Sequence, residues 1–168
     1  MKSILVLVTM FFVGCSSKYP PLETVKKVDI EKYKGTWYEV ARFEHFFEKN
    51  CKNVTATYEI REDQKIAVTN KCTDITTNKE KEATGVAYAI DKTNSKLKVS
   101  FFRPFYGDYW ILDLEENYQY ALVGSPSREL LWILSRTKKL SDETKQNILK
   151  KLPDLGFDQE KFIWTIQE

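Results

Sequence analysis

The feature that most constrains the fold is a series of eight short segments rich in β-branched and aromatic residues, with turn or polar residues between most of them. The segments span 35–43, 53–60, 65–72, 82–90, 96–102, 108–114, 118–125 and 129–136. Short strands that follow one another through tight connections pair with their sequence neighbours. This pattern predicts an all-β protein, either an antiparallel barrel or a sandwich.

One later segment has the pattern of a helix. Ser141 is a suitable N-cap, an acidic first turn follows it, and apolar residues recur at helical spacing at Ile148, Leu149 and Leu152. We expect Pro153 to end this helix and Gly156 to turn the chain back. Residues 161–167 then offer a ninth strand, so the predicted order is eight strands, one helix and one strand.

Alternation within the strands predicts which side chains face the interior. Lys96 and Lys98 should face water, which places Leu97, Val99 and Phe101 inside. By the same rule, one face of segment 53–60 is formed by Val54, Ala56, Tyr58 and Ile60. Eight strands enclose room for one small ligand or for filling side chains, and the pattern alone leaves both open.

The amino terminus has the pattern of an export signal. The apolar run Ile4–Val13 is too short to cross a bilayer of roughly 30 Å as a helix, but it suits a signal-peptide core. The ending Phe-Val-Gly-Cys resembles a bacterial lipobox, although Phe12 replaces the usual leucine. It implies a signal peptide over 1–14, acylation of Cys15 and a flexible tether over 15–27. A plain secretory signal cut near Gly14 is the alternative. The rest, 28–168, has the size of one domain.

The two remaining cysteines, Cys51 and Cys72, form an even pair in a chain expected to be exported, which favours a disulfide. They flank a predicted hairpin. If Arg61 faces Gln64, residue 51 falls within about two positions of a partner for residue 72, and a small bulge would bring the cysteines within bridging range. The other interpretation is a metal site, for which one histidine and two distant thiols are a poor ligand set.

The charges of the chain are balanced. It has 26 lysines and arginines against 24 acidic residues, and no basic block. Since neutralisation of phosphates supplies most of the affinity of nucleic-acid binders, this distribution argues against DNA or RNA as a partner.

Three motifs carry a resemblance to a known family. Gly35 and Trp37 form a Gly-x-Trp at the start of the first predicted strand, and Arg136 ends the eighth. A turn at Glu116, Asn117 and Tyr118 matches a further motif loosely. The chain resembles the lipocalins, most closely bacterial outer-membrane lipoprotein lipocalins of the apolipoprotein D branch. The resemblance implies an eight-stranded antiparallel up-and-down β-barrel with one C-terminal α-helix and a short ninth strand.

The resemblance also implies roles for individual residues. Trp37, Arg136 and Gly35 would be structural, with Trp37 plugging the closed end of the barrel and Arg136 lying over its indole. A fatty acid such as palmitate, or a lysophospholipid, would place its tail against Leu97, Val99, Phe101, Tyr106, Tyr109, Ile111 and Trp132. Phe46 and Phe47 would belong to a loop over the mouth. The head-group candidates are Arg42, His45, Lys49 and Arg103.

The resulting hypothesis is a lipid-carrying lipocalin for membrane maintenance, also under stress. It would be anchored at Cys15 in the bacterial outer membrane and would face the periplasm. It is expected to need no cofactor or metal and to have no enzymatic activity. The alternatives are a carrier of a retinoid or bilin, a haem carrier, an isomerase using a free thiol, and an interaction module whose barrel is filled by its own aromatics. A homodimer is left open, since some relatives form dimers.

Overall fold

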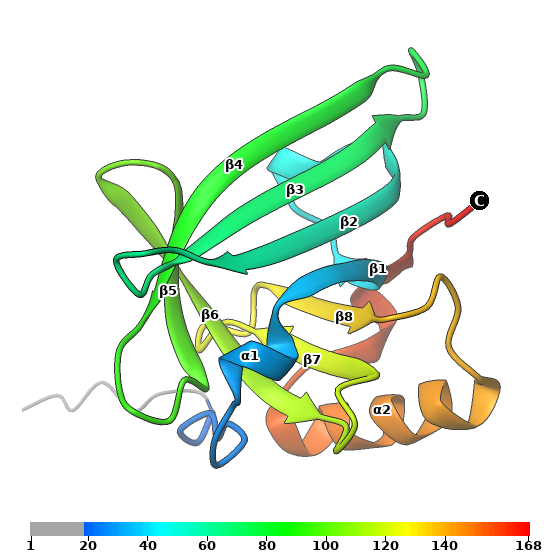
Figure 1. Ribbon diagram of the computed structural model, residues 1–168. Coiled ribbons are helices and arrows are strands. Elements are labelled where there is room, and N and C mark those ends of the chain that lie inside the picture. Colours follow the sequence, from blue (N-terminus) through cyan, green and yellow to red (C-terminus); the bar gives the residue numbers. More distant parts are fainter. Residues whose placement is uncertain (1–18) are drawn as a thin grey trace, which may run out of the picture.

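The computed structural model describes residues 19–168, in which an antiparallel sheet curls into a closed barrel (Figure 1). Each strand pairs with the next one along the chain. The strands are β1 (Gly35–Phe43), β2 (Cys51–Ile60), β3 (Ile66–Asp74), β4 (Glu80–Ala89), β5 (Lys96–Phe102), β6 (Phe105–Leu114), β7 (Tyr120–Gly124) and β8 (Leu131–Ser135).

Strand β1 closes the barrel because it pairs on both of its edges. One edge pairs antiparallel with β2, and this pairing begins with Gly35 opposite Tyr58. The other edge pairs with β8, from Tyr38 opposite Ser135. The short strand β9 (Phe162–Trp164) pairs with the far end of β1. The predicted up-and-down barrel with a ninth strand is therefore confirmed. Strand bounds match the prediction at β1 and β5 and differ by a few residues elsewhere.

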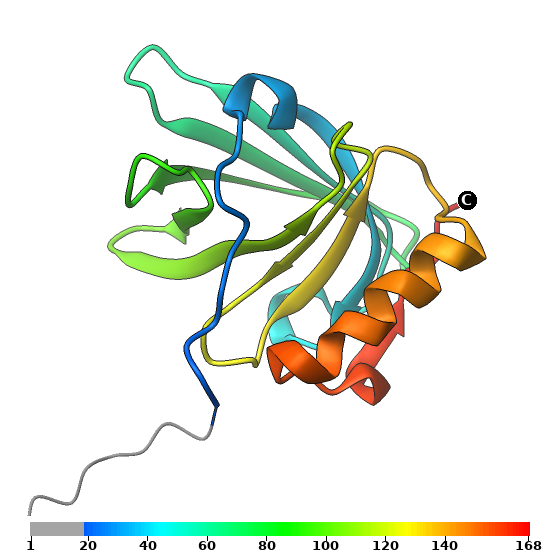
Figure 2. The same cartoon turned by 90° about the horizontal axis from the view of Figure 1, so that it is seen from below.

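The helix α2 (Asp142–Leu155) packs on the outside of the barrel (Figures 1 and 2). Ser141 caps it as predicted, since its hydroxyl accepts a hydrogen bond from the Thr144 amide. Ile148 and Leu152 are fully buried in a cluster that includes Leu122, Ile133 and Phe157. This cluster is distinct from the core inside the barrel.

The prediction that Pro153 ends α2 is wrong, because Pro153 lies within the helix. Pro153 lacks the N–H that would bond the carbonyl four residues earlier, and its ring crowds that carbonyl, yet the helix continues after it to Leu155. The helix ends at Gly156 instead, which has a φ of 79° and donates its N–H to the carbonyls of Leu152 and Pro153. Such a left-handed C-terminal position favours glycine.

The described part of the predicted tether lies against the barrel. Leu22 is buried, the Val25 amide donates to the Ile111 carbonyl at 3.0 Å, and the Thr24 and Ser95 hydroxyls are 3.0 Å apart. This segment leads into the one-turn helix α1 (Ile30–Tyr33). The packed part of the chain thus begins before Val28, in contrast to a flexible tether up to residue 27. The predicted signal peptide and Cys15 lie outside the described residues.

Within residues 19–168, no helix combines the length and apolar character needed to cross a membrane.

A disulfide joins Cys51 to Cys72, as predicted, with Cα atoms 5.5 Å apart. Cys51 pairs with Asp74 in the β2–β3 ladder, two positions from Cys72. The register shifts between Lys52 and Thr55, which is the predicted bulge. The bond fastens the start of β2 to β3 beside the loop that follows β1.

Removal of this bond is expected to destabilise the protein. Under the chain-entropy model, the double change Cys51→Ser and Cys72→Ser should lower the free energy of unfolding by about 3 kcal/mol, because the unfolded chain regains the freedom of the open loop. Urea denaturation of the oxidised wild type and the double variant measures the difference. Equal midpoints for the two proteins would contradict the expectation.

Candidate ligand-binding site

The closed end of the barrel is sealed by Trp37 and Arg136. Trp37 has no exposed surface and donates its indole N–H to the Tyr33 carbonyl at 2.8 Å. The Arg136 guanidinium lies 3.8 Å from the centroid of the indole, a cation–π contact. The same guanidinium donates to backbone carbonyls of Lys32, Tyr33, Lys34, Thr36 and Tyr118. One side chain therefore ties α1, the start of β1 and the β6–β7 turn into a floor.

Gly35 begins β1 with a φ of 92°, in the left-handed region that favours glycine. A Cβ added there would approach only Arg136 Nη1, at an ordinary 3.5 Å. The backbone angle, and not a lack of space for a side chain, is therefore the reason for glycine at this position.

Above this floor the barrel encloses a cavity of about 420 Å³. This volume lies within the range of about 300–1,000 Å³ found for small-molecule sites. The walls are mostly apolar and come from β2, β3, β4, β5, β6, β8 and the turn before β8, through Val54, Ala56, Val68, Ala87, Leu97, Val99, Phe101, Tyr106, Leu130, Trp132 and Leu134 among others. The interior is therefore not filled by the protein's own aromatics, which removes the basis of the filled-barrel alternative.

Most residues predicted to contact a ligand tail line this cavity. They are Leu97, Val99, Phe101, Tyr106, Tyr109 and Trp132, and Phe46 joins them from the loop. Ile111 does not line the cavity. It is fully buried in the core with Val28 and Trp37, towards the closed end of β6. The side chain of Phe47 lies outside the described part of the chain.

Tyr58 and Tyr109 line the lower part of the cavity, and Tyr33 is hydrogen-bonded to Tyr109. The Tyr109 hydroxyl lies 2.8 Å from those of both Tyr33 and Tyr58. Burial raises the pKa of all three, so they stay protonated at neutral pH. Because these hydroxyls bond to one another, the floor can receive an apolar group without leaving them unpaired.

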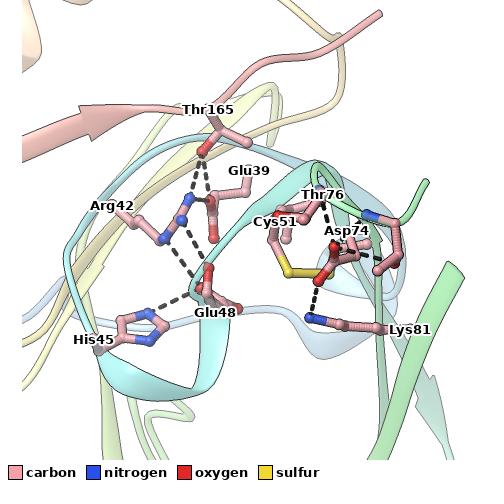
Figure 3. The surroundings of a disulfide bond; sticks show 12 residues. Glu39, Arg42, His45, Glu48, Cys51, Asp74, Thr76, Lys81 and Thr165 are labelled. Atoms are coloured by element: carbon pink, nitrogen blue, oxygen red, sulfur yellow. Dashed lines mark hydrogen bonds and ion pairs between the residues drawn. A yellow bond between two sulfur atoms is a disulfide. The ribbon is translucent and has the colours of Figure 1, made fainter. Parts of the chain in front are cut away.

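A buried charged cluster stands at one side of the cavity, between β1 and the short helix η1 (Phe46–Glu48) (Figure 3). Arg42 Nη1 lies 2.9 Å from Glu39 Oε1, and Arg42 Nη2 donates to the Glu48 carbonyl at 2.9 Å. His45 Nε2 lies 2.9 Å from Glu48 Oε2. Thr165, just after β9, donates its hydroxyl to Glu39. The cluster fastens the mouth loop to the barrel wall and to the C-terminal strand.

The pKa values of the two carboxyl groups in the cluster, Glu39 and Glu48, shift in opposite directions. Burial, with the negative charge of Glu48 nearby, raises the pKa of Glu39 to about 8. Burial also acts to raise the pKa of Glu48, but hydrogen bonds and charge from His45, with Arg42, outweigh it and lower that pKa. At neutral pH, Glu39 is therefore mostly protonated, and the ionised Glu48 carboxylate lies 3.7 Å from Arg42 Nε.

Glu39→Gln is expected to make the protein more stable at alkaline pH. The folded protein keeps on Glu39 a proton that the unfolded chain releases above its ordinary pKa of 4.5. The stability contribution of Glu39 is therefore lost as the pH rises from about 4.5 to about 8. Glutamine stays neutral throughout, so the stability of the variant relative to wild type should rise by roughly 3–4 kcal/mol from pH 5 to pH 8. Urea unfolding at several pH values measures this gain.

Glu62→Gln, in an exposed turn, is the matched control for this change. It should shift stability little at any pH. A Glu39→Gln effect that is the same at pH 5 and at pH 8 would contradict the raised pKa.

The predicted head-group residues are not gathered at the cavity. Arg42 and His45 are buried in the charged cluster and do not line it. Lys49 and Arg103 are exposed in turns at the mouth. Glu39, Glu48 and Asn70 also line the cavity, although the sequence did not predict them there. Glu39 could have been found, since it lies two positions from Trp37 on the inward face of β1. Glu48 lies in an irregular loop, where alternation gives no signal.

A second hollow of about 380 Å³ adjoins the cavity on the side of the disulfide. Phe46, Phe101 and Phe102 line both spaces, while Cys51 and Cys72 line only the second. The apolar interior thus continues between η1 and β4 towards solvent.

Among the described residues, no group of three or more His, Cys, Asp or Glu side chains is arranged to hold a metal ion. With both described cysteines in the disulfide, the thiol needed for the isomerase hypothesis is lacking in this part of the chain.

Comparisons with known proteins agree with this architecture. A family model described as a lipocalin-like domain matches residues 28–167. Outer membrane lipoprotein Blc of Escherichia coli is 46% identical over 158 residues, covering 92% of this chain and 89% of that protein. Apolipoprotein D of Mus musculus is 35% identical over 161 residues, covering 88% and 80%. The structure of the cockroach allergen Per a 4 superposes with a TM-score of 0.71 at 20% identity, covering 90% and 97%.

A sealed floor, an up-and-down barrel and an apolar cavity define a binding protein for small hydrophobic ligands. The chain belongs to the lipocalin family, as the motifs at Gly35, Trp37 and Arg136 predicted. Membership of this family also agrees with the prediction that the protein is not an enzyme.

Proposed function

We propose that the protein is an outer-membrane lipoprotein that stores or carries one fatty acid or lysophospholipid in its barrel. The observation that carries this proposal is the mostly apolar cavity of about 420 Å³ above a sealed floor. Each methylene moved from water into such a space contributes about 0.8 kcal/mol. A long acyl chain can therefore reach micromolar affinity even after the entropic costs of binding are subtracted.

The tail would enter first and the head group would stay at the mouth. Val99, Phe101 and Trp132 would contact the upper tail, and Tyr109 would lie near its end. Arg42 is buried and already bonds Glu39 and the backbone at Glu48, so it is a poor partner for a second anion. The exposed cations Lys49 and Arg103 are better placed to meet a carboxylate or phosphate.

The proposed location follows from the amino terminus. Residues 1–14 would be removed as a signal peptide, Cys15 would be acylated, and the domain from 28 to 168 would follow a linker. The name of the E. coli relative, an outer membrane lipoprotein, supports this location. The barrel would face the periplasm and help to maintain the membrane, including under stress.

Native mass spectrometry of the mature protein tests the proposed ligand. The protein would be stripped of lipid and incubated with palmitate, a lysophosphatidylethanolamine, retinol and biliverdin in equal amounts. We expect one acyl ligand per barrel, with affinity rising with acyl length until the cavity is full. Preference for retinol or biliverdin would favour the pigment-carrier alternative. A folded barrel that retains none of the four would refute the proposal. The same spectra report whether the protein is a monomer or a dimer.

A further inference from the structure

The open end of the barrel carries a cluster of exposed aromatic side chains. In an up-and-down barrel, the β1–β2, β3–β4, β5–β6 and β7–β8 connections share one end, opposite the floor. Three phenylalanines of this end, Phe46, Phe102 and Phe105, are 82%, 75% and 70% exposed. We call them the aromatic rim. All three also line the cavity.

Two residues of the rim hold a fixed arrangement. The rings of Phe102 and Phe105 are stacked with centroids 6.3 Å apart, at either end of the β5–β6 turn. Arg103 lies between them in the sequence and is exposed. Large apolar side chains gathered in this way on a surface commonly mark a contact with a membrane or a protein.

The amino-terminal segment leaves the domain at this same end. It runs along the barrel from α1 towards the β7–β8 turn (Figure 2). There Arg128 donates from Nη2 to the Pro20 carbonyl at 2.7 Å, and its guanidinium lies 5.5 Å from the Tyr19 ring centroid. These contacts fix the exit point of the chain beside an open-end turn.

The proposed anchor is close to this exit point in the sequence. Only residues 16–18 separate Cys15 from Tyr19. A fully extended chain covers at most about 3.6 Å per residue, so Tyr19 would lie within roughly 15 Å of an acylated Cys15. A tether this short holds the open end, rather than the floor, next to the bilayer.

We propose that the aromatic rim docks on the bilayer that holds the anchor, so that the cavity opens directly into lipid. This inference rests on the proposed acylation of Cys15. The rings of Phe102 and Phe105 would enter the interfacial region, and Arg103 would meet lipid phosphates. A lipid could then pass between bilayer and cavity without crossing water, and the docked mouth would keep the cavity closed to solvent.

Quenching by brominated lipids tests the docking. The full lipidated protein, as wild type, Phe102→Trp and Ile90→Trp, would be reconstituted into vesicles of phosphatidylethanolamine and phosphatidylglycerol, with and without brominated acyl chains. Ile90 is the control because it is 47% exposed in the β4–β5 connection, at the floor end. After subtraction of the wild-type signal, we expect brominated chains to quench the Phe102→Trp probe and to leave the Ile90→Trp probe unquenched.

The mass of each mature protein reports acylation of Cys15 independently. If the chain is acylated and the two probes are quenched equally, or neither is quenched, the docking is wrong while the proposed lipoprotein remains. A different outcome is possible in which brominated lipids do not quench the Phe102→Trp probe, but its emission in unbrominated vesicles changes with protein density. In that case a second copy of the chain covers the rim, and the docking is wrong. A mass without acyl groups would overturn both proposals.

Discussion

Arg136→Ala is expected to lower the free energy of unfolding by about 3–4 kcal/mol. The change removes the cation over the Trp37 indole and leaves the carbonyls of Tyr33 and Thr36 without their charged donor. Hydrogen bonds from a charged donor contribute about 1.5–3 kcal/mol each, and the cation–π contact adds about 0.5–2 kcal/mol. Urea denaturation followed by tryptophan fluorescence measures the loss.

Two variants show whether geometry or charge matters at this position. Arg136→Lys keeps the charge but cannot donate to several carbonyls at once, so it should recover only part of the loss. Arg61→Ala removes an exposed arginine paired with Asp63 and should cost less than about 1 kcal/mol. An Arg136→Ala protein as stable as Arg61→Ala would show that the floor does not depend on this side chain.

Val99→Glu is expected to weaken acyl-chain binding by roughly 100-fold or more. Val99 faces the cavity from the middle of β5, where the tail would lie. A carboxylate at this position stays hydrated, and it removes apolar surface that would otherwise contact the ligand. The loss of a few methylene contacts at about 0.8 kcal/mol each corresponds to two powers of ten in Kd. Titration with a fluorescent fatty acid measures the change.

The matched control for this variant is Thr69→Glu. It introduces the same charge on β3, at a position between the cavity-lining Val68 and Asn70 whose side chain faces outward by alternation. It should bind as wild type does. If Val99→Glu binds equally well while its thermal unfolding shows an intact fold, the acyl tail does not lie in this cavity.

The barrel was largely predictable because its signals are local and repeated. Alternation placed Leu97 and Val99 on the inner face of β5 and put Val54 and Ala56 together on one face of β2, and the structure has all four on the cavity wall. The disulfide register followed from counting outward from a hairpin turn. These inferences use only the twofold period of a strand and the pairing of neighbours.

The charged cluster was not predictable, because it depends on an irregular loop and on a residue far away in the sequence. Arg42 was expected to meet a head group at the mouth, yet it pairs with Glu39 and with the backbone at Glu48. The path of residues 44–50 brings Glu48 back onto β1, and no periodic pattern describes such a loop. Thr165 completes the cluster from far along the chain, through the pairing of β9 with β1.

Pro153 and Ile111 show two further limits. A proline disfavours a helix interior on average, but α2 continues past Pro153 because its last turn is closed by the Gly156 N–H and its apolar face packs on the barrel. Ile111 faces inward as its strand requires, but inward residues near the floor belong to the packed core, and only those higher in the barrel line the cavity. The side of the strand on which a side chain lies follows from the sequence, whereas its height above the barrel floor depends on how all the strands are arranged.

The closing seam between β1 and β8 has a consequence for how the chain folds. Tyr38 pairs with Ser135, across about 100 positions, so most of the domain must be present before the seam can form. Until then, β1 and β8 are open edges that can pair with other chains. Pairing over such a separation is slow compared with helix formation. The cavity does not exist until the seam is made, so the unfinished barrel has no enclosed space for a lipid.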